Sequence, residues 1–481
     1  MLQSQGYSLS DIDCTLSDEK TIINIKGIVS EFSIFESVDS PAVRAEFLIT
    51  DVNDFVSALR GYEQITLKLK TDSADETYEL KHRIYKIGSN IKTERTQQYI
   101  IHTVSEAAII NEKVKVFKTF KGPVKNTVQK VLKENLGISK KIVVEDTLGT
   151  FPFISPSWRP YDLISYLTDK TIRGASKSSN INQQQSAFLF FENRDAVYFY
   201  SIDGLIEKAA RGVSKYASKS GTTSPVKVFT YKQKNVGITE NGYYSIENIT
   251  YPDKYDIITQ LRSGTLGTSL LGVDPQSINE SYLPKSSKTS DTDTANPKGP
   301  GGGNYQVVDM TAATSWQSRF SHLPNSENPF TKIGGSYGHG ERKRLKFFNS
   351  YGWDSSSGGD ITGTLQASNT APKGSPLATG TTNKGGSGNV TQQIAVAALY
   401  SLMRYQALNY IKLNIVVPGN TGVAAGDVIE VVIPSSRETA KNLPKESTYS
   451  GTYMVLGVVH IWRPEGVSTH LQIGRDSISK K

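Results

Sequence analysis

Cysteine is almost absent from this chain of 481 residues. Cys14 is the only one, which excludes an internal disulfide bond and any metal cluster built from several cysteines. No run approaches the ~20 apolar residues of a membrane-spanning helix, and the opening "MLQSQGYSLSDIDCTL" lacks the basic start and apolar block of a signal peptide. We therefore expect synthesis in a cytoplasm and no association with a membrane.

The sequence also lacks enzyme motifs. It contains no "HExxH", no "GxSxG" and no Walker loop. The triplet "HGE" at His339 to Glu341 is superficially like that of a deaminase, but the zinc of such an enzyme needs cysteines that this chain does not have. Asp11 and Asp13 form a carboxylate pair, and nothing marks them as a glycosidase acid and nucleophile. We expect no catalytic residue, no bound metal and no cofactor.

Positive charge is present but uneven. The net charge is +8, and the stretch Lys208–Lys234 contains seven basic residues and no acid. It lacks aromatics at regular spacing and sits on no recognisable nucleic-acid module. An acidic protein neighbour or plain solvent fits this stretch better than phosphates, so we expect no sequence-specific nucleic acid as a partner.

The length suggests about three domains, and most segments have the pattern of strands. Residues 1–105 alternate as strands, with one short helix in "DVNDFVSALRG". Residues 106–230 are mixed: "PVKNTVQKVLKENLG" and "RPYDLISYLTDKTI" have helical spacing, and "FLFFENRDAVYFY" indicates a hairpin. A second β domain combines 231–262 with 405–481. Residues 263–404 are a Gly/Ser-rich insertion with a helix at its end.

Two low-complexity runs, Ser286–Asn304 and Asp354–Asn389, lie in this insertion. Their Ser, Thr, Gly, Asn and Pro content cannot bury a core, so we expect them to be ordered only where another molecule holds them.

The segment "YMVLGVVHIWRPEGVSTHLQI" predicts a β-hairpin near the carboxyl end. If Arg463 to Gly466 form the whole loop, Trp462 faces Val467, His460 faces Thr469, and His470 points to the other face of the sheet. A three-residue loop instead brings the two histidines together. Even then no cysteine or carboxylate completes a zinc site, so we interpret both histidines as framework.

Two parts of the chain repeat one order of strands. "GYEQITLKLK", "YELKHRIYKIG" and "QQYIIHTVSE" compare with "GDVIEVVIP", "YMVLGVVHIW" and "STHLQIGRD". A generic β-meander has the same look, so the comparison supports two copies of one module without requiring them.

The path from "SPSWRPYDLISYLTDKTI" through "FLFFENRDAVYFYSIDGL", "ITYPDKYDIITQ" and "YIKLNIVVPGNTGVAAGDVIEVVIP" to the last hairpin resembles the baseplate hub proteins of contractile-tailed phages, relatives of the hub part of type VI secretion spikes. The resemblance spans most of the chain. It implies a mainly β protein with α+β parts, in which two tube-like β-barrel domains flank a mixed domain and the long insertion departs from a minimal hub.

The resemblance also implies a function. Three such chains form a homotrimer with a pseudo-sixfold ring, which joins a threefold central spike to a sixfold tail tube or its initiator proteins. The location implied is the virion tail baseplate, assembled in the host cytoplasm, with other baseplate proteins as further neighbours. The alternative is a tail component that degrades cell wall or polysaccharide or binds carbohydrate. In that alternative the aromatics Phe188 to Tyr200 hold sugar; core packing of a two-sided sheet also explains them, and we favour that interpretation.

Overall fold

The computed structural model describes residues 6–72, 77–93, 95–148, 151, 153–174, 185–210, 227–231, 244–251, 258, 262, 267–273, 305–311, 342–347, 398, 400–402, 404–409, 411–434 and 449–476. Most of the elements in these ranges are strands, and the expectation of a mainly β protein with α+β parts is confirmed. Among the described residues, no helix has the length and apolar character needed to cross a membrane. Both low-complexity runs and the "HGE" triplet lie outside the described ranges.

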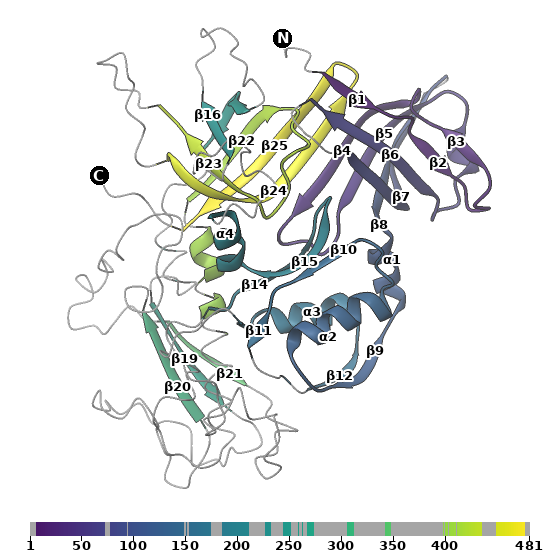
Figure 1. Cartoon of the computed structure of the whole chain (residues 1–481). Coiled ribbons are helices and arrows are strands. Elements are labelled where there is room, and N and C mark those ends of the chain that lie inside the picture. Colours follow the sequence, from purple (N-terminus) through teal and green to yellow (C-terminus); the bar gives the residue numbers. More distant parts are fainter. Residues whose placement is uncertain are drawn as a thin grey trace.

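Strands from both ends of the chain form one large sheet of 15 strands (Figure 1). The amino-terminal strands are β1 (Tyr7–Leu9), β2 (Asp13–Thr15), β3 (Ile22–Asn24), β4 (Val29–Ser37), β5 (Arg44–Asp51), β6 (Gln64–Thr71), β7 (Tyr78–Lys92) and β8 (Gln97–Ser105). The later strands are β16 (Lys227–Tyr231), β17 (Ser245–Ile246), β18 (Asn248–Thr250), β22 (Ile411–Pro418), β23 (Val428–Val432), β24 (Gly451–Arg463) and β25 (Gly466–Arg475).

Within this sheet one pattern of five strands occurs twice. The first unit has the order β4-β5-β8-β7-β6, and the second unit has the order β18-β22-β25-β24-β23. Every neighbouring pair in both units is antiparallel. The strand order of the three-segment comparison is therefore confirmed, and the structure extends it from three strands to five.

Alternation of apolar residues gives each unit its own core. Phe32, Phe47, Ile65 and Tyr99 are among the buried residues of the first unit, and Leu413, Tyr453 and Leu471 are among those of the second. Successive side chains of a strand point to opposite faces, so each strand contributes every second residue. The helical pattern at "DVNDFVSALRG" gives a short 3₁₀ turn, Phe55–Ala58, whose Phe55 joins the first core.

The mixed region lies below the large sheet in Figure 1 and contains short strands and helices. Its elements are α1 (Glu106–Lys113), β9 (Val116–Phe120), α2 (Val124–Lys130) continued by a π-helical turn (Val131–Asn135), β10 (Lys141–Val144), β11 (Thr147–Leu148), β12 (Phe153–Trp158), α3 (Pro160–Thr168), β13 (Ile172–Arg173), β14 (Phe188–Glu192), β15 (Ala196–Ser201) and α4 (Ile202–Ala210). Pro160 stands at the first turn of α3, where its missing N–H costs no hydrogen bond, and Gly137 follows the α2 segment with a φ of 60°.

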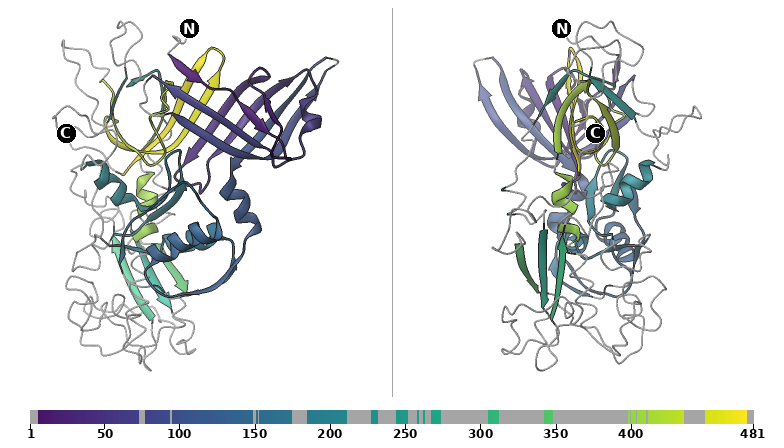
Figure 2. Two further views of the ribbon diagram at one scale, coloured as in Figure 1. Left: turned by 45° about the vertical axis from the view of Figure 1, so that its right-hand side comes forward. Right: turned by 90° about the vertical axis from the view of Figure 1, so that its left-hand side faces the viewer.

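A separate three-stranded sheet with the order β20-β19-β21 lies within residues 263–404. Its strands are β19 (Gly267–Val273), β20 (Tyr305–Thr311) and β21 (Arg342–Phe347). Both views of Figure 2 place this sheet at the far end of the molecule from the two five-strand units.

Candidate functional site: the junction of the two units

The two units meet edge to edge through β4 and β24. The pairing is antiparallel and runs from Gly457 opposite Ser37 to Trp462 opposite Phe32. At its end the rings of Trp462 and Phe32 stack with centroids 5.1 Å apart, so that a tryptophan of the second unit enters the core of the first. This pairing joins residues more than 400 positions apart into one continuous sheet.

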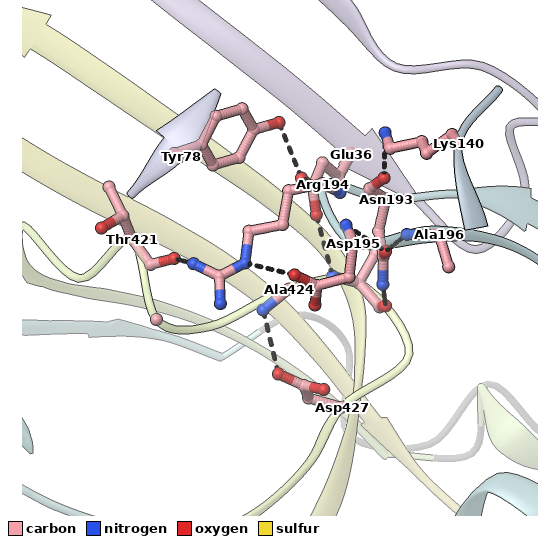
Figure 3. Close-up of polar contacts among 12 residues, drawn as sticks. Glu36, Tyr78, Lys140, Asn193, Arg194, Asp195, Ala196, Thr421, Ala424 and Asp427 are labelled. Carbon is pink, nitrogen blue, oxygen red and sulfur yellow. Dashed lines mark hydrogen bonds and ion pairs between the residues drawn. The ribbon is translucent and has the colours of Figure 1, made fainter. Parts of the chain in front are cut away.

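A buried carboxylate lies where this sheet meets the mixed region (Figure 3). Glu36 of β4 is 3% exposed. It accepts hydrogen bonds from the Tyr78 hydroxyl at 2.8 Å, from the Arg194 backbone N–H at 2.9 Å and from the Ala425 backbone N–H at 3.2 Å. Burial raises the pKa of Glu36, and the hydrogen bond from Tyr78 opposes that shift. One side chain thus connects the first unit, the mixed region and the second unit.

The turn between β14 and β15 supplies the other contacts of this cluster. Asn193 Nδ2 donates to the Ala425 carbonyl at 3.0 Å, while its Oδ1 accepts from the backbone N–H groups of Asp195 and Ala196 at 2.9 and 3.1 Å. The Arg194 guanidinium donates to the Thr421 carbonyl and forms an ion pair with Asp195, as Figure 3 shows. The asparagine shapes the turn, and the arginine fixes it to the second unit.

Lys140 supports the same turn from the mixed region. Its ammonium donates to Glu192 Oε1 at 3.0 Å and to the Asn193 carbonyl at 2.6 Å. The second carboxylate oxygen of Glu192 accepts from the Val43 backbone N–H of the first unit at 3.2 Å. The mixed region is therefore bonded to both units at one place.

A second buried cluster attaches the mixed region to the end of β25. Arg404 is 1% exposed and forms ion pairs with Asp203 of α4, at 3.0 Å, and with Asp476. The Tyr400 hydroxyl donates to Asp203 at 2.6 Å. Buried charges are tolerated when they are paired in this way.

The predicted hairpin forms with the register expected for a four-residue loop. Trp462 stands opposite Val467 and His460 opposite Thr469, while His470 pairs with Val459 and so points to the other face. His460 is fully buried beside the Thr469 hydroxyl at 3.1 Å, and His82 is buried beside Thr103 at 3.3 Å. Burial lowers the pKa of each histidine to about 3, so both imidazoles are neutral.

Other candidates from the sequence are not brought together into a site. Among the residues described, no three His, Cys, Asp or Glu side chains are arranged to hold a metal ion. Phe188 and Phe190 are buried in the core of the mixed region, and Tyr198 and Tyr200 pack against a neighbouring cluster, which is the arrangement of core aromatics. Most of the basic stretch Lys208–Lys234 lies outside the described residues.

The sequence interpretation missed the junction, although it left one signal. In β4 the buried positions alternate as Phe32, Ile34 and Glu36, so a charged residue continues an apolar face. A carboxylate at a core position implies buried partners. The partners of Glu36 come from distant segments of the chain, and no sequence motif identifies them.

Comparisons with known proteins complete these observations. No family model matches the chain. A probable baseplate hub protein, gp334 of Vibrio phage KVP40, is 23% identical over 238 residues, which are 46% of this chain and 54% of the relative. The chain thus spans about half the length of that curated relative, and the resemblance to phage baseplate hub proteins is confirmed at the level of sequence.

Solved structures give weaker likenesses. A tail protein from Neisseria meningitidis MC58 has 11% identity and a TM-score of 0.48, with 98% of each chain covered. An E. coli type VI secretion component described as similar to phage T4 tail proteins has 9% identity and a TM-score of 0.40, covering 94% of this chain and 74% of its own. Both TM-scores are below 0.5.

Proposed function

We propose that this chain is the structural hub subunit of a phage tail baseplate, with no catalytic turnover. The observation that carries the proposal is the repetition of one five-strand unit within one chain, with the two copies joined edge to edge by β4 and β24. The sequence similarity to a probable baseplate hub protein supports it.

The repeated unit allows one protein to match partners of two different symmetries. A homotrimer of chains with two similar units presents six similar surfaces, so one ring fits a threefold partner on one side and a sixfold partner on the other. The hub joins the threefold central spike to the sixfold tail tube or its initiator proteins. It resides in the virion tail baseplate after assembly in the host cytoplasm.

The domain plan of the hub follows the same division. Residues 1–105 are a tube-like β-barrel domain, and 231–262 with 405–481 are its second copy. Residues 106–230 form the mixed domain, except that β16 pairs with β23 of the second copy, and residues 263–404 form the insertion. The polar junction around Glu36 and Arg194 has a mechanical role in this plan, because it fixes the angle between the two copies.

Size-exclusion chromatography with light scattering tests the proposal. We expect a species of three times the chain mass. Zymography on peptidoglycan, run beside it, is expected to show no lysis. A stable monomer, or lytic activity lost on changing one carboxylate, contradicts the structural hub.

A further inference from the structure

The two units share more than strand order. The two residues just before β6 bond to β7 through the same pair of backbone hydrogen bonds by which the two residues just before β23 bond to β24. The Tyr62 N–H donates to the Ile84 carbonyl at 3.0 Å, and the Ile84 N–H donates to the Glu63 carbonyl at 2.8 Å. In the second unit the Gly426 N–H donates to Val455 at 2.9 Å, and the Val455 N–H donates to Asp427 at 2.8 Å. Ile84 is therefore equivalent to Val455.

The same irregularity follows in both strands. The pairing of β7 with β8 shifts between Ile84 and Lys86, and that of β24 with β25 shifts between Val455 and Gly457. Tyr85 is thus equivalent to Leu456, and Ile87 to Val458. A second shift in β7 places Ile91 opposite Gln98, where Ile461 stands opposite Ser468.

These equivalent edges also differ in their cover. On β24 the edge from Gly457 to Trp462 is paired with β4, and Leu456 and Val458 are 6% and 0% exposed. On β7 the pairing with β6 ends at Arg83, and in the described part of the chain no strand covers the edge beyond it. Tyr85, the equivalent of buried Leu456, is 49% exposed, and Ile91, the equivalent of half-buried Ile461, is 63% exposed. An uncovered edge with apolar side chains is a site for strand addition.

The chain also carries the strand that matches this edge. In the second unit β18 lies on β22 as β4 lies on β5 in the first. Thr250 faces Asn414 as Ser33 faces Glu46, so Thr250 is equivalent to Ser33. Among the described strands β18 pairs only with β22, and Tyr251 after it is 45% exposed.

We propose that the open edge of β7 receives β18 of a second copy of this chain, in the arrangement that β4 adopts on β24. Because Ile461 stands opposite Ser33, the equivalent pair between subunits is Ile91 with Thr250. Each chain then has one internal junction, and its β7 edge and its β18 are the acceptor and the donor of a second junction, so copies associate head to tail and close into a ring. The inference deepens the proposed hub function and rests on it.

Disulfide trapping tests the register. Ile91→Cys and Thr250→Cys variants are co-expressed under different tags, purified and mildly oxidised. We expect covalent dimers carrying both tags, and none from either variant alone. The native Cys14 does not compete, because burial raises the pKa of its thiol to about 12. The matched control combines Thr250→Cys with Ile22→Cys on β3, because the side chain of Ile22 is as exposed as that of Ile91. This control is expected to give no dimer.

A charged substitution on the open edge of β7 is a second test, in which the mass of the assembled species is measured. Ile91→Asp is expected to convert the assembled species to monomer, whereas Val52→Asp, at an apolar residue that is 65% exposed and lies at the end of β5 instead of on β7, leaves the mass unchanged. A trimer that gives no Ile91–Thr250 disulfide and tolerates Ile91→Asp overturns the edge proposal and leaves the proposed hub function standing. A wild-type monomer overturns both.

Discussion

At the scale of single residues, the junction depends most on Glu36. A buried carboxylate is costly unless its oxygens are satisfied, and here three donors from three parts of the chain satisfy them. Its raised pKa records that cost. The residue is thus a connector whose removal leaves buried N–H groups without an acceptor.

Glu36→Ala is therefore expected to lower the free energy of unfolding by about 3 kcal/mol or more, since each unsatisfied buried donor costs roughly 1–3 kcal/mol. The control is Glu46→Ala on β5, whose carboxylate contacts His102 at a half-exposed site, and its expected cost is below about 1 kcal/mol. Urea unfolding measures both. Equal costs contradict the connector role.

The buried histidines make the fold sensitive to acid. The folded-state pKa of His460 is about 3 and its ordinary value is 6.5, so below pH 6.5 the unfolded chain takes up a proton that the folded chain does not. Stability from this residue is complete above pH 6.5 and is lost as the pH falls toward 3, by about 1.4 kcal/mol per pH unit.

His460→Gln is expected to reduce the loss of stability between pH 6.5 and 5 by about 2 kcal/mol relative to wild type, as measured from urea midpoints. His470→Gln, at an exposed position on the opposite face, serves as the control and should change this loss less. Assembly should persist in both variants, because no metal is lost. An unchanged pH dependence in His460→Gln contradicts a neutral buried imidazole.

At the scale of elements, local patterns predicted much and distant pairings could not be predicted. The turn in "RPEG" fixes the register of β24 on β25: Arg463 pairs with Gly466, Pro464 and Glu465 form the turn, and side chains alternate with a period of two from there. The strands of β5 and β22 have clear alternation too. The positions of β5 and β22 within the repeated unit are set by partner strands far along the chain. The same holds for the pairing of β4 with β24, because the sequence of neither strand indicates the other as its partner.

Leu471 of β25 tests the inward face of the second unit. It is 1% exposed within that core. Leu471→Asp places a charge there and is expected to cost several kcal/mol, enough to unfold the unit and abolish assembly. Gln472→Asp, one residue along on the exposed face, is the control and should unfold like wild type in thermal and urea melts. Matching losses in both variants contradict the assigned faces.

At the scale of the whole molecule, one chain contains one completed edge junction and the two halves of another. The internal β4–β24 pairing shows the geometry that such a junction takes. The hydrogen bonds at Ile84 and Val455 show that β7 and β24 have the same backbone geometry where the open edge of β7 begins, and β7 has one further irregularity between Gly88 and Ile91. Copies of this chain can therefore join to one another by repeating the internal junction between chains. In the proposed ring a trimer contains six units and six junctions.

Electron cryomicroscopy of the purified assembly tests this central claim most directly. The account predicts a closed ring of three chains, with six five-strand units related by rotations near sixty degrees and β18 of each chain lying on β7 of the next. A monomer, or a ring in which the two units of one chain are not related by such a rotation, contradicts it.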